Sequence, residues 1–103
     1  MAANEIHVGD VGTAFERTIT EGATAVNISS ATLMQLVFRK PDGTTMTKTA
    51  VWTTTGTDGK LRYVTIAGDL SVAGQWGLQA YVEMNGGKWH TDIDYFTVYQ
   101  NLS

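Results

Sequence analysis

Residues 68–76 read Gly-Asp-Leu-Ser-Val-Ala-Gly-Gln-Trp, a turn-rich corner that leads straight into an alternating segment. From Gln75 to Met84 every second residue is apolar, which is the pattern of a strand with one buried face. The apolar positions are Trp76, Leu78, Ala80, Val82 and Met84. A corner of this kind carries the chain from the edge of one sheet to the next, as in two-layer antiparallel sandwiches. The segment therefore predicts architecture, and it contains no catalytic motif.

The composition favours one globular β domain. The chain has 103 residues, of which 43% are hydrophobic and 17% charged, so it has enough apolar residues for one core. Threonine, glycine and β-branched residues outnumber the good helix formers. The absence of cysteine excludes disulfides and thiolate metal sites. We expect a single domain over residues 1–103 that is held together by its core and its strand pairing.

The charge distribution argues against nucleic acid and membranes as partners. The net charge is −3, and the basic residues are scattered apart from the adjacent pair Arg39 and Lys40, whereas nucleic-acid binding needs a basic patch. We expect this pair to lie at a solvated strand end. The start of the chain has no basic region with an apolar run, and no segment is long enough to span a bilayer. We therefore expect a protein that is made in a cytoplasm and is not secreted.

Several turn signals divide the middle of the chain into strands. Residues 33–39 are apolar enough for a central strand, with Met34, Leu36 and Phe38 as its expected core residues. Residues 41–43, Pro-Asp-Gly, predict a hairpin, because proline presets φ and glycine accepts a positive φ. Residues 46–53 form the expected return strand, with alternate residues 46, 48, 50 and 52 on one face.

The second half of the chain continues the pattern. Residues 53–59 predict a flexible connection, and residues 60–66 the next strand. The Asn-Gly-Gly at residues 85–87 predicts a tight hairpin turn. In the last expected strand, residues 88–100, the alternation slips between residues 93 and 96, which predicts a bulge or a change of sheet. The predicted fold is an all-β, immunoglobulin-like antiparallel β-sandwich of about seven strands.

Four motifs occur in order along the chain. They are Val-Asn-Ile-Ser-Ser-Ala-Thr at residues 26–32, Phe-Arg-Lys-Pro-Asp-Gly at 38–43, Asp-Gly-Lys-Leu-Arg-Tyr at 58–63, and Ala-Gly-Asp-Leu at 67–70 with Ala-Gly-Gln-Trp at 73–76. This order resembles the immunoglobulin-like domains of bacteriophage tail and baseplate proteins, particularly the N-terminal domain of the baseplate upper proteins. The first motif departs from the family's Asp-Leu-Thr-Gly-Ala form in lacking the glycine.

The resemblance implies a structural or accessory protein of the virion that docks on other particle proteins. A tail or baseplate component is favoured, with a head decoration protein as an alternative. Such a protein would act in multiple copies in a symmetric assembly inside the particle, which is assembled in the cytoplasm of the bacterial host. Exposed strand edges are covered by neighbours in such assemblies. We therefore expect contacts at residues 3–10, within a possible docking arm of residues 1–10, and at the tail of residues 99–103.

A weak metal-site candidate lies in the last expected strand. His90, Asp92 and Asp94 alternate with other residues, so an unbroken strand would place all three on one face. Calcium needs six to eight oxygen ligands and zinc three or four converging ligands, which one strand does not supply. A solvated or partner-facing strand face is the favoured interpretation, and we predict no metal and no cofactor.

Other residues are candidates for binding a partner rather than for chemistry. Tyr81 falls among the polar positions of its strand, Trp89 follows a turn, and His7 and Tyr99 lie near the two ends of the chain. The alternative is a carbohydrate-binding adhesion module that uses exposed aromatic rings to stack on cell-surface sugars, although most large aromatics are expected in the core. The rings considered are Trp52, Tyr63, Trp76, Tyr81, Trp89, Tyr95 and Tyr99.

No pattern in the chain indicates catalysis. The serines lack the context of a nucleophile elbow, no glycine-rich phosphate loop is present, and Asp92 and Asp94 are the only paired carboxylates. We therefore predict that the protein is not an enzyme.

Overall fold

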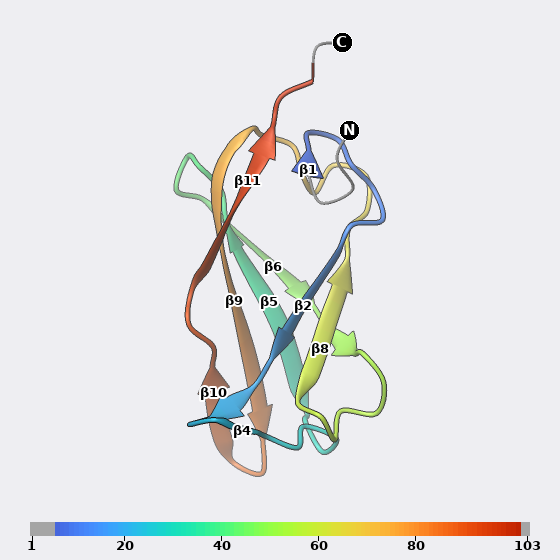
Figure 1. Cartoon of the computed structure of the whole chain (residues 1–103), viewed down its shortest axis with the longest axis vertical. Coiled ribbons are helices and arrows are strands. Elements are labelled where there is room, and N and C mark those ends of the chain that lie inside the picture. The colour runs from blue at the N-terminus through green and yellow to red at the C-terminus, as the bar shows by residue number, and fades with distance from the viewer. Residues whose placement is uncertain (1–5, 102–103) are drawn as a thin grey trace.

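The computed structural model describes residues 6–101, and within this range the chain is all-β with no helix. The described range contains eleven strands, several of them only two residues long, and Figure 1 shows how they are arranged. They are β1 (Ile6–His7), β2 (Ala14–Thr18), β3 (Thr20–Glu21), β4 (Thr24–Ala25), β5 (Leu33–Arg39), β6 (Thr45–Thr49), β7 (Val51–Trp52), β8 (Lys60–Val64), β9 (Gly74–Met84), β10 (Gly87–His90) and β11 (Asp94–Tyr99). The predicted all-β class is confirmed.

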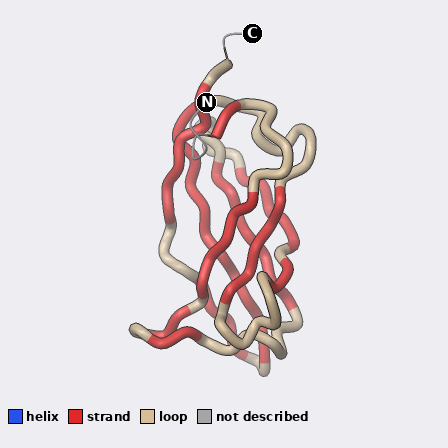
Figure 2. Tube along the Cα trace, turned by 45° about the vertical axis from the view of Figure 1, so that its right-hand side comes forward, coloured by secondary structure: helices blue, strands red, loops and turns tan. Residues whose placement is uncertain are grey.

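The strands form two sheets and a small hairpin. The larger sheet has the order β1-β11-β9-β5-β6, and β10 also pairs with β9; the smaller sheet has the order β2-β8-β7, and β3 pairs with β4. In Figure 1 the smaller sheet lies across one face of the larger one, and in Figure 2 most loops gather at the two ends of the molecule. The larger sheet is mixed, because β1 runs parallel to β11 with Ile6 opposite Val98.

The expectation of a purely antiparallel arrangement is therefore wrong at β1. This strand leads into β2 of the other sheet rather than through a hairpin to its neighbour, so no tight turn forces an antiparallel direction. The remaining strand pairs of both sheets are antiparallel.

The core lies between the facing sides of the two sheets. The alternating face predicted for β9 is confirmed, since its five apolar residues are at most 6% exposed. Phe15 of β2 reaches across to Phe38 of β5, with ring centroids 5.2 Å apart. Leu36 and Phe38 are fully buried as predicted, whereas Met34 is only partly buried and packs at the margin of the core. Burial of these side chains supplies most of the stabilisation of such a fold.

Two predicted hairpins are confirmed. Between β5 and β6, Gly43 has φ = 90° and the Asp42 carboxylate accepts a hydrogen bond of 3.0 Å from the N–H of Thr44. Between β9 and β10, Asn85 and Gly86 both have positive φ, as a two-residue primed turn requires. These turns fix the registers on both sides of the central strands.

The last predicted strand contains a bulge, but at residues 91–93, just before the predicted position between residues 93 and 96. Both β10 and β11 pair with the same edge of β9, with His90 opposite Tyr81 and Asp94 opposite Leu78. Residues 91–93 therefore face only residues 79–80, which leaves one residue too many on the bulged strand. The Thr91 hydroxyl fills the gap in the ladder by accepting a hydrogen bond of 2.9 Å from the N–H of Ala80.

The predicted continuous strand at residues 46–53 is wrong. The chain leaves the larger sheet after β6, buries Ala50, and joins the smaller sheet as β7. The connection that follows is packed against the rest of the fold. Gly56 is buried against the indole of Trp52, and its carbonyl accepts a hydrogen bond of 2.8 Å from the N–H of Ile28. A side chain at residue 56 would collide with that indole.

The corner at residues 68–76 is built around a buried carboxylate. Asp69 accepts hydrogen bonds from the Tyr63 hydroxyl and the Ile66 N–H, and it forms an ion pair with Lys48. Burial raises the pKa of Asp69, but the hydrogen bonds outweigh burial and hold this pKa below its usual value. The hydrogen bond to Asp69 raises the pKa of Lys48. The pKa of Tyr63 is also raised, mainly by burial and also by its own hydrogen bond to Asp69.

Candidate functional site

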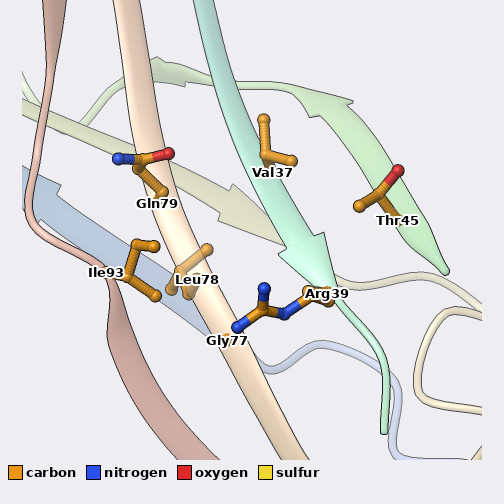
Figure 3. Close-up of a pocket in the computed structure, with 7 residues that line it drawn as sticks. All are labelled: Val37, Arg39, Thr45, Gly77, Leu78, Gln79 and Ile93. Atoms are coloured by element: carbon orange, nitrogen blue, oxygen red, sulfur yellow. The ribbon is translucent and has the colours of Figure 1, made fainter. Parts of the chain in front are cut away.

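The outer face of the larger sheet carries a groove that faces away from the core. Figure 3 shows its lining side chains, which come from three neighbouring strands and from the bulge. The hollow encloses about 140 Å³. Its lining residues are Val37, Arg39, Thr45, Gly77, Leu78, Gln79 and Ile93. We call this hollow the outer-face groove.

The outer-face groove exists because Gly77 contributes no side chain to an otherwise covered face. A Cβ at this position would lie 3.5 Å from Cγ2 of Ile93, 3.7 Å from Cε1 of Tyr95 and 3.9 Å from Cβ of Arg39. These neighbours form the walls, and the backbone of β9 forms the floor. A glycine inside a strand commonly marks a place where another group approaches the backbone closely.

The rim of the groove combines apolar surface with a free positive charge. Ile93 is 46% exposed and Tyr95 58% exposed, although both are large apolar side chains. Arg39, at the end of β5, forms no ion pair with any residue of the range 6–101, and Figure 3 shows its guanidinium reaching toward Gly77. Arg39, which we expected at a solvated strand end, therefore also forms one wall of the outer-face groove. Exposed apolar groups with a polar rim are typical of interaction sites.

This groove was not predicted from the sequence, although one signal for it was present. Among the outward positions of β9, glycine at residue 77 interrupts a series of longer side chains. Another wall of the groove comes from Ile93, whose position depends on the bulge. A bulge changes the direction of the side chains that follow it, so strand periodicity alone does not place this residue.

The predicted alignment of His90, Asp92 and Asp94 on one face is wrong. His90 lies opposite Tyr81 on the outer face, whereas Asp94 lies opposite the buried Leu78 and points toward the smaller sheet. The extra residue of the bulge reverses the alternation between them. Within residues 6–101, no three His, Asp or Glu side chains form a group that would hold a metal ion.

These residues line a different feature, a hollow that we call the polar depression. It lies between β2 and the bulged connection from β10 to β11, and it encloses about 380 Å³. Its lining residues are Arg17, Thr18, Thr20, His90, Thr91, Asp92 and Asp94. An ion pair of 2.7 Å between Arg17 Nε and Asp94 Oδ2 crosses from the smaller sheet to the larger one at this place.

The structure brings two predicted partner residues together at the ends of the chain. The rings of His7 and Tyr99 lie 5.8 Å apart, and Tyr99 is 48% exposed. His7 Nδ1 lies 3.0 Å from Asn101 Oδ1, and the amide of Asn101 donates a hydrogen bond of 2.7 Å to the carbonyl of Val8. Two residues of the expected docking arm, Ile6 and His7, form strand β1 and pair with β11, while residues 1–5 and 102–103 lie outside the described range.

The other two predicted partner residues lie on opposite faces of the larger sheet. Tyr81 is half-buried on the outer face, and its hydroxyl donates a hydrogen bond of 2.5 Å to Glu83, which raises the pKa of Tyr81. Trp89 lies opposite Val82 on the core side, where its ring covers Gly87. The expectation of an exposed Trp89 is wrong, because the hairpin register directs it inward and it packs at the margin of the core.

The tryptophans do not share one exposed surface. Trp76 is fully buried, and its indole N–H donates a hydrogen bond of 3.0 Å to the carbonyl of Val72. Trp52 is 38% exposed, and its indole N–H is bound to the carbonyl of Ile28 at 2.8 Å. The exposed rings that remain are tyrosines and histidines of the larger sheet.

No family model, curated protein or solved structure matches this chain. The resemblance to phage tail and baseplate domains therefore rests on the order of the sequence motifs. Among residues 6–101 there is no helix long and apolar enough to cross a membrane.

Proposed function

We propose that this chain is a non-enzymatic structural or accessory protein of a bacteriophage particle, with a tail or baseplate position favoured. It docks on other particle proteins through the outer face of its larger sheet, in several copies within a symmetric assembly. The observation that carries this proposal is the outer-face groove, where exposed Ile93 and Tyr95 lie beside Arg39, which has no ion-pair partner among residues 6–101. The order of the sequence motifs supports a bacteriophage particle, and the groove supports the outer face of the larger sheet as the docking surface.

The proposal includes an immunoglobulin-like sandwich as the fold. Two sheets share one core, and a turn-rich corner joins β8 to β9; both features support an immunoglobulin-like sandwich. Fold alone does not determine function, so the assignment to a particle depends on the docking surface and on the motifs together.

A docking role also agrees with the chemistry of the groove. Side chains of the larger sheet that face outward are mostly uncharged, as at Val37, Thr45 and Gln79, and interface cores are depleted in charged residues. The single guanidinium supplies a fixed donor for a carboxylate or a backbone carbonyl of the partner. The most prominent buried ion pair, between Lys48 and Asp69, is explained by its structural role at the corner, so it does not call for an enzymatic one.

Quantitative mass spectrometry of density-purified particles tests the proposal. The chain is measured against the major shell protein and the tail proteins of a phage that carries its gene. A low, fixed ratio to the tail proteins is the expected result. An abundance close to that of the shell protein replaces the tail position with a head decoration role. Absence from the particles contradicts the proposal.

A further inference from the structure

The polar depression is distinct from the outer-face groove in position and in chemistry. The groove lies on the outer face of the larger sheet, whereas the depression lies between the two sheets beside the bulge. Its size is within the range of small-molecule sites, about 300–1,000 Å³. All seven of its lining side chains are polar or charged. Whatever it binds must therefore offer several hydrogen-bonding groups.

Part of this lining is held in place by contacts within the protein. Arg17 Nε forms an ion pair with Asp94 Oδ2 at 2.7 Å, and Arg17 Nη1 donates a hydrogen bond of 2.6 Å to the carbonyl of Glu16. Thr91 is fixed by its bonds to the Ala80 N–H and the Asp92 carbonyl. Preorganised groups lose little conformational entropy when a ligand binds.

The remaining lining groups have free hydrogen-bonding capacity. The side chains of Asp92, Thr18 and Thr20 form no hydrogen bond or ion pair with any residue of the described range. The centroid of the His90 ring lies 4.6 Å from that of the Tyr81 ring. The depression thus offers donors from Arg17 and the threonines, and acceptors from two carboxylates. Donors and acceptors therefore line the same hollow.

This mixture selects against most ligand classes. Two carboxylates repel an anion, and the described acidic and histidine side chains do not converge on a cation. The polar lining gives an apolar ligand no favourable contact. Vicinal hydroxyl groups fit, because each hydroxyl both donates and accepts a hydrogen bond.

We propose that the polar depression binds a neutral pyranose ring of a carbohydrate. Asp92 and the free oxygen of Asp94 accept hydrogen bonds from neighbouring sugar hydroxyls, and Arg17 donates to one of them. This site does not depend on the docking role of the outer-face groove, and either proposal stands if the other fails.

The test is a nuclear magnetic resonance titration of the ¹⁵N-labelled protein. The probes are methyl α-D-glucopyranoside, methyl β-D-galactopyranoside and the methyl β-glycoside of N-acetyl-D-glucosamine, each added to about 50 mM, because single-sugar sites bind in the millimolar range. Glycerol, sodium phosphate and calcium chloride are titrated in parallel. We expect at least one glycoside to shift the amides of Thr91, Asp92 and Asp94 with saturation.

Variants locate the site. Asp92→Ala removes an exposed carboxylate with no internal partner, so the fold is kept, and we expect glycoside affinity to fall about tenfold. The control is Gln75→Ala, an exposed residue of β9 away from the depression, which leaves the affinity unchanged. The proposal is overturned if no glycoside shifts these amides, if glycerol, phosphate or calcium produces the same shifts, or if Asp92→Ala binds as the unmodified protein does.

Discussion

Lys48 Nζ lies 3.0 Å from Asp69 Oδ1, and this ion pair joins the edge strand of the larger sheet to the corner that follows β8. The Asp69 side chain is 5% exposed and that of Lys48 is 26% exposed. Because Tyr63 of the smaller sheet donates to the same carboxylate, one buried group connects both sheets. A charge that points inward from an edge strand also disfavours uncontrolled pairing of that edge with other chains.

Replacing this carboxylate should destabilise the fold. Asp69→Asn leaves Lys48 without its charged partner and weakens the bonds from Tyr63 and Ile66, so we expect a loss of about 2 kcal/mol in the free energy of unfolding. Urea denaturation measures this loss. The control is Asp92→Asn, which changes an exposed carboxylate without an internal partner and should stay within about 0.5 kcal/mol of the unmodified protein. Equal effects of the two variants would contradict the structural role of Asp69.

The Asp69 carboxylate also predicts how the free energy of unfolding changes at acid pH. The pKa of Asp69 is lower in the folded state than its unfolded value of about 3.9, so its contribution is present above about pH 4 and is lost as the pH falls through the folded pKa. The stability difference between the unmodified protein and Asp69→Asn should therefore shrink below about pH 4. Urea titrations across the acid range measure it. A difference that stays constant down to about pH 2 would rule out this origin.

At alkaline pH the dependence is reversed, and stability falls as the pH rises. The pKa values of Lys48 and Tyr63 are raised in the folded state, so their contribution is present below about pH 10 and is lost as the pH rises through the folded values. We expect Lys48→Met to show a flatter decline of stability above about pH 10 than the unmodified protein. Thermal unfolding at increasing pH measures the decline, and identical slopes would count against the predicted contribution of Lys48.

Alanine substitutions at two glycines distinguish the cost of backbone strain from the cost of a steric clash. Gly22 has φ = 62° and open space around its Cβ position, so Gly22→Ala should cost only the strain of the left-handed conformation, about 1 kcal/mol. Gly56 has φ = 84°, and a Cβ there would lie 2.5 Å from Cδ1 of Trp52, whose indole is held by Ile28. Gly56→Ala should cost about 2 kcal/mol more than Gly22→Ala in chemical denaturation. Similar costs would show that the loop at residues 53–59 is not packed as described.

The bulge predicts a local change that hydrogen exchange detects. Thr91→Val removes the acceptor of the Ala80 N–H, so this amide should exchange faster and the fold should lose about 1–2 kcal/mol. Thr97→Val is the matched control, because Thr97 is exposed on β11 and its side chain has no described hydrogen bond. Unchanged protection of Ala80 in Thr91→Val would mean that the hydroxyl does not complete the ladder.

The sequence was sufficient to predict the elements that depend on local rules. The alternation of residues 75–84 identified the buried face of β9, and the glycines and asparagine of the two hairpins supplied the positive φ that those turns need. Periodicity also predicted a bulge or a change of sheet in the last strand, but it placed the slip between residues 93 and 96, whereas the bulge lies just before, at residues 91–93.

Features that depend on distant pairing could not be predicted in the same way. The parallel pairing of β1 with β11 joins segments at opposite ends of the chain, and the change of sheet at Ala50 interrupts an alternation that runs on without a break. The outer-face groove needs Gly77 and Ile93 at once, which only the folded register brings together. The metal-site pattern failed because the bulge reverses its faces between His90 and Asp94.

Incorporation of groove variants into particles tests the docking account most directly. A phage that lacks the gene is complemented with the unmodified chain, with Ile93→Asp, or with Ile66→Asp, and the chain is quantified in purified particles. Ile66 is the control, because it is 58% exposed beside the smaller sheet, away from the groove, where Ile93 is 46% exposed. The account predicts that Ile93→Asp folds but is depleted at least about tenfold from particles, while Ile66→Asp is retained. Retention of folded Ile93→Asp at the unmodified level, or absence of the unmodified chain from particles, would contradict it.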